Sequence, residues 1–253
     1  MSRTLSPFSR GSRRGSSRDR EIKIKNNNNT YANTYTIHRG SWRPWAKDDG
    51  RVYERLVELG TGEVRPAVCI WSLPMNVNKE IEYIKHGENR EYYFALLEDG
   101  LRRLSQAGST QIVIPCNTVH EFHRRLQNLT HLPVTNLIEI VADEVQEKGW
   151  KSVALLTTSR TRSTNLYQDA LAKRGITWSF PSNEDQLLLD QLVQGLLGNA
   201  NDDTHQKFLL NLIEKMGEMH IVLGCTDLQL ALVPSENIID SLEVLVKKTV
   251  QVV

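Results

Sequence analysis

The same pattern occurs twice in this chain, in Gln111-Ile-Val-Ile-Pro-Cys-Asn-Thr-Val-His120 and in Met219-His-Ile-Val-Leu-Gly-Cys-Thr-Asp-Leu228. Each stretch is a short apolar run that ends in a cysteine followed by hydrogen-bonding side chains. A continuous apolar run is typical of a strand that is buried on both faces of a parallel sheet. The two stretches therefore predict two such strands, each with a thiol at its carboxyl end, where open α/β sheets bind their ligands.

Outward from these stretches, apolar strand-like runs alternate with segments of helical period. Strands are expected at 64–73, 111–115, 132–135, 152–157, 176–180 and 221–224, and helices at 92–107, 119–126, 138–148, 164–174, 186–197 and 205–216. Such alternation is the pattern of parallel sheets that helices cover on both faces. The expected fold class is α/β, with doubly wound and mainly parallel sheets.

The composition is that of an ordinary soluble protein, because 40% of the 253 residues are hydrophobic and 24% are charged. No apolar run approaches the ~18–20 residues of a membrane span, so no membrane partner is expected. The net charge of +1 is unevenly distributed: residues 1–30 carry eight basic and two acidic side chains, and 23 basic and 28 acidic side chains remain in 31–253. This acidic body predicts no nucleic-acid partner.

Residues 1–34 are rich in Ser, Arg, Gly and Asn and lack periodic apolar positions, which predicts a disordered basic tail. The Arg- and Ser-rich start resembles an organellar transit peptide, although the apolar face of an amphipathic helix is missing, so targeting stays open. The three cysteines, Cys69, Cys116 and Cys225, do not pair completely and are too widely spaced for structural zinc. We therefore expect a reducing, cytoplasmic compartment and no metal site.

Cys116 and Cys225 are 109 residues apart, a separation that suits one thiol in each of two α/β lobes. At the start of a helix, unpaired backbone N–H groups and the helix dipole favour a thiolate. A single such cysteine is more often a buried small hydrophobe than a catalyst, and the paired motif favours the catalytic interpretation. Cys69 lies inside an apolar strand-like run and is expected to be a core residue.

The two stretches resemble motifs of the aspartate/glutamate racemase superfamily. Its Pro/Ala-Cys-Asn-Thr-Ala-His motif is similar to Pro115-Cys-Asn-Thr-Val-His120, and its Gly-Cys-Thr-Glu motif is similar to Gly224-Cys-Thr-Asp227. Val153-Ala-Leu-Leu-Thr-Thr158 resembles the strand that the family writes Ala-Leu-Leu-Gly-Thr. The resemblance covers about residues 50–250 and is nearest to the aspartate and broad-specificity amino-acid racemase branch. It implies two similar lobes with the site in the cleft between them, usually in a homodimer, and inversion without a cofactor at a carbon next to a carboxylate.

The resemblance also implies a role for each matching residue. Cys116 and Cys225 are the expected catalytic pair, one removing the α-proton of an amino-acid substrate and the other delivering a proton to the opposite face. The carbanionic transition state needs N–H and hydroxyl donors around the carboxylate, expected from Asn117, Thr118, Thr158 and Thr226. Asp227 either orients a neighbouring group or only complements a helix dipole. His120 either tunes Cys116 or contacts substrate, or it packs locally.

Two departures from the family pattern are visible. The glycine-rich opening loop of the family corresponds to Ile37–Gly50, where Trp42 and Arg43 do not adopt a glycine conformation cheaply, so Arg39 or Arg43 is expected to replace the lost N–H donors. At 185–193, where some aspartate racemases carry a lysine for the side-chain carboxylate, the sequence has Leu187, Leu188 and Leu189. Burying a second carboxylate without a cation is costly, so the substrate is left open.

The lobes are expected to comprise 35–137 with 238–253, and 138–237. The leading functional hypothesis is an amino-acid racemase that inverts Cα between two cysteines. Within the same superfamily, an isomerase or hydantoin racemase remains an alternative, and outside enzymes, a non-catalytic binding or regulatory protein. Entry of deuterium at Cα separates an enzyme from a binding protein, because exchange requires a working base.

Overall fold

The computed structural model describes residues 34–40, 47–59, 67–197, 203–232 and 235–251. These residues belong to one unit, Tyr31–Val253. The predicted tail up to residue 33 lies outside the described residues, as do Trp42 and Arg43 of the altered opening loop.

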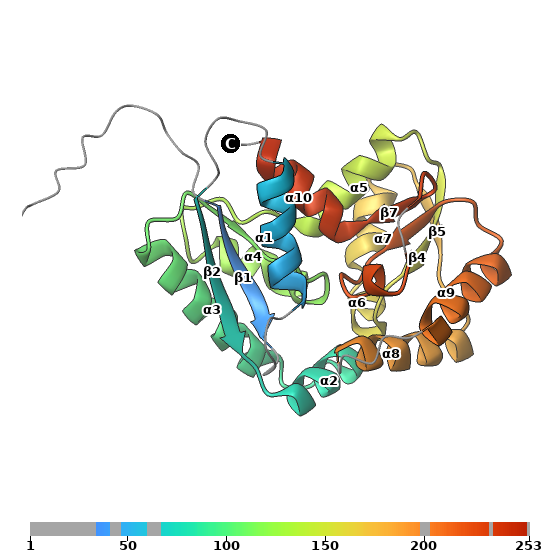
Figure 1. Cartoon of the computed structure of the whole chain (residues 1–253), viewed down its shortest axis with the longest axis horizontal. Coiled ribbons are helices and arrows are strands. Elements are labelled where there is room, and N and C mark those ends of the chain that lie inside the picture. Colours follow the sequence, from blue (N-terminus) through green and yellow to red (C-terminus); the bar gives the residue numbers. More distant parts are fainter. Residues whose placement is uncertain (1–33, 41–46, 60–66, 198–202, 233–234, 252–253) are drawn as a thin grey trace, which may run out of the picture. The chain divides into compact units, whose positions relative to one another are not determined.

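Two parallel sheets form the framework (Figure 1). The first has the order β2 (Val68–Pro74), β1 (Thr34–Gly40), β3 (Gln111–Val113). The second has the order β5 (Thr177–Ser179), β4 (Ser152–Leu156), β6 (Ile221–Leu223), β7 (Ile238–Asp240). All pairs of these strands are parallel. The α/β prediction with two parallel lobes is therefore confirmed.

Helices connect the strands and cover the sheets. Those that precede the second sheet are α1 (Lys47–Leu59), α2 (Val77–His86), α3 (Arg90–Gln106), the 3₁₀ helix η1 (Thr118–Phe122), α4 (His123–Gln127) and α5 (Leu137–Glu147). Those that follow β4 are α6 (Ser159–Ser163), α7 (Leu166–Ala172), α8 (Asn183–Leu197), α9 (Asp203–Met216), the 3₁₀ helix η2 (Leu228–Leu230) and α10 (Ser241–Gln251). On α3, the apolar stripe read from the sequence faces the core, because Leu97, Leu101 and Leu104 are buried.

Strand β4 shows why the second lobe is doubly wound. Its residues alternate between the two faces of the sheet: Val153 and Leu155 belong to a cluster with α5 and α7, whereas Ala154 and Leu156 belong to a cluster with α8 and α9. Both faces are thus closed by helices, which explains the uninterrupted apolar run. Burying each Val or Leu side chain contributes about 1.5–3 kcal/mol.

Three local predictions differ from the structure. Residues 132–135 are not a strand: Val134 makes a single parallel bridge to Ile112, because Pro133 has no N–H to donate to a ladder. The helix expected at 164–174 is the shorter α7, which Asn165, with a left-handed φ of 58°, separates from the preceding α6. The helix expected at 119–126 begins as η1 and continues as α4.

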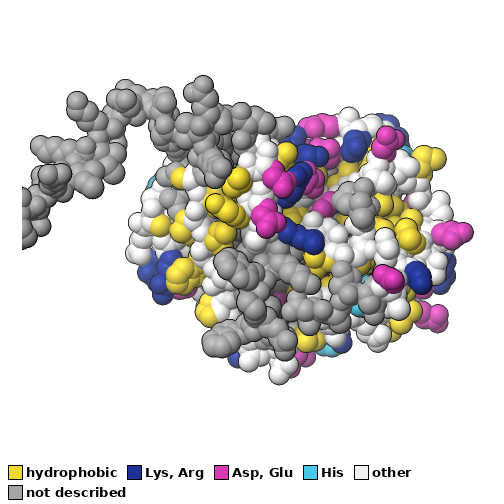
Figure 2. Space-filling view, viewed as in Figure 1, with side chains coloured by type: hydrophobic (Ala, Val, Ile, Leu, Met, Phe, Trp, Pro, Cys, Tyr) yellow, Lys and Arg dark blue, Asp and Glu magenta, His cyan; other side chains and the backbone are white. Residues whose placement is uncertain are grey.

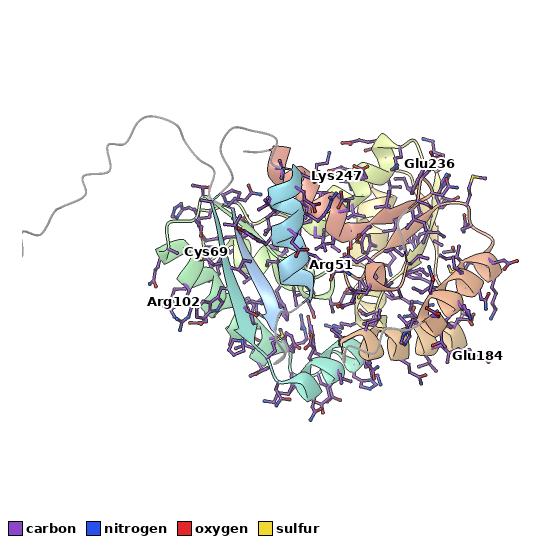
Figure 3. All side chains as sticks on the ribbon, viewed as in Figure 1. Arg51, Cys69, Arg102, Glu184, Glu236 and Lys247 are labelled. Atoms are coloured by element: carbon purple, nitrogen blue, oxygen red, sulfur yellow. The ribbon has the colours of Figure 1, made fainter. Side chains whose placement is uncertain are left out.

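The end of the chain connects both lobes. β7 pairs with β6 in the second sheet, and Leu242 and Val246 of α10 pack against Val52 and Leu56 of α1. The proposed boundaries at 137/138 and 237/238 therefore stay a prediction. Cys69 lies on β2 (Figure 3) and is half-buried against the core of the first lobe rather than enclosed in it. On the face in Figure 2, acidic and basic side chains are interspersed, as on an ordinary solvated surface.

Candidate active site

Both cysteines that the sequence singles out lie just beyond the carboxyl ends of strands. Cys116 follows β3 and precedes η1, and Cys225 follows β6 and precedes η2. Each is 5% exposed. The elements that follow are 3₁₀ helices of five and three residues rather than the expected helices. A helix dipole therefore contributes less to either thiolate than the sequence suggested, because the dipole grows with aligned peptide units.

A hydrogen bond joins the two cysteine motifs. The hydroxyl of Thr226 donates to the carbonyl oxygen of Pro115 at 3.3 Å. These residues directly follow Cys225 and directly precede Cys116. The fold thus brings together two motifs that lie in different sheets and are separated by more than a hundred residues.

Three buried threonine hydroxyls form a triangle beside the first motif. The Oγ1 of Thr118 lies 3.2 Å from that of Thr158 and 3.0 Å from that of Thr161, and the last two are 3.0 Å apart. Thr158 also caps α6, since its Oγ1 accepts from the backbone N–H of Thr161 at 3.2 Å. Thr161 was not among the expected site residues, although its position three residues after the helix-capping Thr158 could have indicated it.

Asn117 is held at both ends of its amide. Its Nδ2 donates to the hydroxyl of Ser241 at 3.0 Å, and its Oδ1 accepts from the hydroxyl of Tyr167 at 2.6 Å. Neither Tyr167 nor Ser241 carries a motif that sequence reasoning could use. Asp240, the neighbour of Ser241, is buried, and burial raises the pKa of its carboxyl group to about 6.

Asp227 and His120 each contact the cysteine of their own motif. The thiol of Cys225 donates to Oδ2 of Asp227 at 3.6 Å, so this carboxylate faces the sulfur. The Nδ1 of His120 lies 2.7 Å from the carbonyl oxygen of Cys116, and its Nε2 lies 3.4 Å from that of Thr135. Burial lowers the pKa of His120 to about 4, which keeps the ring neutral at physiological pH. The geometry of His120 matches local packing.

A partly buried ion pair links η1 to α6. The guanidinium of Arg160 donates to both carboxylate oxygens of Glu121, at 3.1 and 2.6 Å. Arg90 binds the same carboxylate at 2.7 Å, and the hydroxyl of Tyr83 donates to it at 2.5 Å. Burial is the main reason that the pKa of Tyr83 rises above its ordinary value. Such a pair holds the threonine triangle together from the outside, since Thr118 and Thr161 belong to the two elements it joins.

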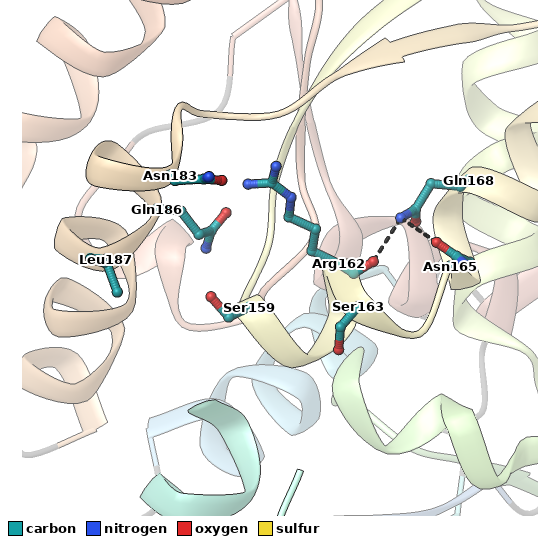
Figure 4. A pocket seen from close by; sticks show the side chains of 8 residues that line it. All are labelled: Ser159, Arg162, Ser163, Asn165, Gln168, Asn183, Gln186 and Leu187. Carbon is teal, nitrogen blue, oxygen red and sulfur yellow. Dashed lines mark hydrogen bonds between the residues drawn. The ribbon is translucent and has the colours of Figure 1, made fainter. Parts of the chain in front are cut away.

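A surface pocket of about 550 Å³ lies between α6 and α8 (Figure 4). Arg162 and Gln186 point toward one another across it, and Leu187 lines its rim. None of the expected site residues lines this pocket; its nearest connection to them is Ser159, which follows Thr158. Leu187 and Leu188 are exposed, at 63% and 47%, whereas Leu189 is buried.

Among the described residues, no group of three or more His, Cys, Asp or Glu side chains is arranged to hold a metal ion. In that same part of the chain, no helix has the length and apolar character needed to cross a membrane.

Comparison with known proteins connects this geometry to one family. Residues 51–249 match the family described as Asp/Glu/Hydantoin racemase. The broad specificity amino-acid racemase RacX of Bacillus subtilis is 29% identical over 191 residues, which cover 73% of this chain and 81% of that protein. An aspartate racemase homologue from Pyrococcus horikoshii superposes with a TM-score of 0.68 at 23% identity, over 87% of this chain and 98% of that one. The aspartate racemase of Picrophilus torridus superposes with a TM-score of 0.72 at 19% identity, over 87% and 94% of the two chains. The last two likenesses show that the fold is shared.

Proposed function

Since the chain belongs to the Asp/Glu/hydantoin racemase family, we propose that it racemises amino acids by proton transfer between Cys116 and Cys225, without a cofactor. The observation that carries this proposal is the hydrogen bond from Thr226 to Pro115 at 3.3 Å. Two-sided proton transfer requires an acid and a base on opposite faces of one carbon. A hydrogen bond between residues that adjoin the two thiols supports an arrangement in which both thiols reach one substrate carbon.

The reaction proceeds in two proton transfers. A thiolate removes the proton from Cα, the electron pair of the C–H bond is delocalised into the carboxylate, and the opposite thiol then delivers its proton to the other face. In the arrangement described above, Cys225 donates to Asp227 and so carries its proton. Cys225 is then the acid and Cys116 the base for one enantiomer, and the roles are reversed for the other.

Stabilisation of the carbanion falls to the donors around the substrate carboxylate. Asn117, Thr118, Thr158 and Thr226 are the residues proposed for this role, and Thr161 joins them through the hydroxyl triangle. All five side chains are buried, so bulk water has little access to them. Donors fixed in a site that excludes water stabilise developing charge more strongly than water does.

Broad specificity is the substrate preference that this chain supports. The chain is 29% identical over 191 residues to a protein named as a broad specificity amino-acid racemase. Some aspartate racemases carry a lysine in this region, where this chain has the exposed Leu187 and Leu188 and the buried Leu189, and none of these supplies a cation.

We propose a homodimer in the cytoplasm, to be tested by light scattering and by localisation of the full chain.

The test uses single enantiomers of a panel of amino acids in heavy water, followed by chiral chromatography and by proton NMR of the Cα position. We expect Cys116→Ala and Cys225→Ala to abolish racemisation, with exchange of the α-proton surviving for one enantiomer at most. Cys69→Ala is the matched control, because Cys69 lies on β2 outside both motifs, and it should keep full activity. Dialysis against a chelator should leave the rate unchanged. Racemisation by either motif variant at the normal rate would refute the two-thiol mechanism, and no exchange with any amino acid would favour a binding protein.

A further inference from the structure

Tyr167 contacts both cysteine motifs although it belongs to neither. It lies on α7 and is 1% exposed. Its hydroxyl donates to Oδ1 of Asn117, the residue after Cys116, at 2.6 Å. Its ring packs against Gly224, the residue before Cys225, so closely that a Cβ at Gly224 would lie 2.9 Å from Cε2 of the ring. One side chain thus supports the backbone of one motif and the side chain of the other.

The hydroxyl of Tyr167 is a donor throughout the working pH range. Burial is the main reason that its pKa lies above the ordinary value of a tyrosine. A protonated phenol that donates to Oδ1 determines which end of the Asn117 amide is oxygen and which is nitrogen. The hydroxyl of Ser241 takes one N–H of Nδ2 at 3.0 Å, and the second N–H has no partner among the described residues.

We propose that Tyr167 is a positioning residue, which orients the Asn117 amide so that its second N–H is available to the substrate carboxylate. This inference rests on the proposed racemase function. Without the phenol hydroxyl, the Asn117 amide can rotate about its Cβ–Cγ bond, and the position of its N–H donor is no longer fixed. In Tyr167→Phe the ring keeps its packing against Gly224, and only the hydroxyl that orients the Asn117 amide is lost.

The experiment compares Tyr167→Phe with a matched Tyr92→Phe variant. Tyr92 lies on α3, outside both motifs, and contacts Tyr93 and Lys79. We expect Tyr167→Phe to lower kcat/KM about 10-fold through both a higher KM and a lower kcat, because Asn117 contacts the carboxylate before proton transfer and stabilises its larger charge in the carbanion. Tyr92→Phe should leave both constants unchanged.

A double-mutant cycle separates positioning from general support of the fold. If Tyr167 acts through Asn117, the variant that combines Tyr167→Phe with Asn117→Ala should be no slower than Asn117→Ala alone. Additive losses would show that Tyr167 acts otherwise and would overturn the inference.

A spectroscopic measurement makes the inference independent of activity. The side-chain amide signals of Asn117, assigned by their loss in Asn117→Ala, should move in Tyr167→Phe and stay in place in Tyr92→Phe. Unmoved signals in Tyr167→Phe would overturn the inference and leave the proposed function intact. An inactive wild-type protein whose amide signals nevertheless respond to Tyr167→Phe would refute the racemase function and the catalytic purpose of the contact, but not the contact itself.

Discussion

Acidification should destabilise this protein through His120, and the effect is removable by one substitution. His120 is the last residue of the first cysteine motif, and its ring nitrogens lie against the carbonyl oxygens of Cys116 and Thr135. His120→Asn places an amide nitrogen near the position of Nδ1 and removes the titrating ring. The loss of ring volume costs stability at every pH, so the informative quantity is how the difference between the two proteins changes with pH.

The magnitude follows from the two protonation equilibria. In the unfolded chain the imidazole takes up a proton as the pH falls through 6.5, whereas burial in the folded state lowers its pKa to about 4. Between these values the unfolded state binds more protons, so stability is present above pH 6.5 and is lost as the pH falls toward 4. At 1.36 kcal/mol per pKa unit, the full loss is about 3 kcal/mol, and about 2 kcal/mol of it is reached by pH 5.

Urea denaturation at pH 8 and pH 5 measures this loss. From pH 8 to pH 5, the free energy of unfolding of the wild type should fall by about 2 kcal/mol more than that of His120→Asn. Asp240 titrates in the opposite direction, but it does so equally in both proteins and cancels from the comparison. An identical pH dependence in the two proteins would show that His120 is not buried in its neutral form and would refute the reasoning.

Four other substitutions have expected outcomes. Gly224→Ala should lower the free energy of unfolding by about 1–3 kcal/mol in urea denaturation, because its Cβ would lie 2.6 Å from the Thr157 methyl carbon; an unchanged midpoint would contradict this packing. Burial raises the pKa of Asp240 to about 6, so the wild type loses stability as this carboxyl group ionises between pH 3.8 and pH 6. Asp240→Asn should therefore raise the free energy of unfolding by up to about 3 kcal/mol above pH 6 and have less effect toward pH 3.8. Glu121→Gln should lower the free energy of unfolding by about 1.5–3 kcal/mol, because it weakens the charge-assisted hydrogen bonds to Arg160 in a partly buried pair. Glu91→Gln on the exposed surface should leave the melting temperature unchanged.

Much of the fold was predictable because it depends on local pattern. The runs at 152–157 and 221–224 form β4 and β6, and the helix expected at 138–148 is α5. In such segments, the spacing of apolar residues in the sequence indicates which positions are buried. The misplaced strand at 132–135 shows the limit, because hydrogen bonding there depends on a proline and on the neighbour that Ile112 supplies.

The site divides in the same way. The sequence alone located Cys116, Cys225 and their hydroxyl and amide neighbours, because those residues adjoin strands whose period is local and because their motifs resemble a known family. Tertiary structure alone decided that Thr226 bonds Pro115, that Tyr167 and Ser241 hold Asn117, and that Glu121 pairs with Arg160. The partners in these contacts are 39–124 residues apart in the chain. No periodicity relates such residues, because a hydrogen bond forms only where the packing of whole helices and sheets brings donor and acceptor to about 3 Å.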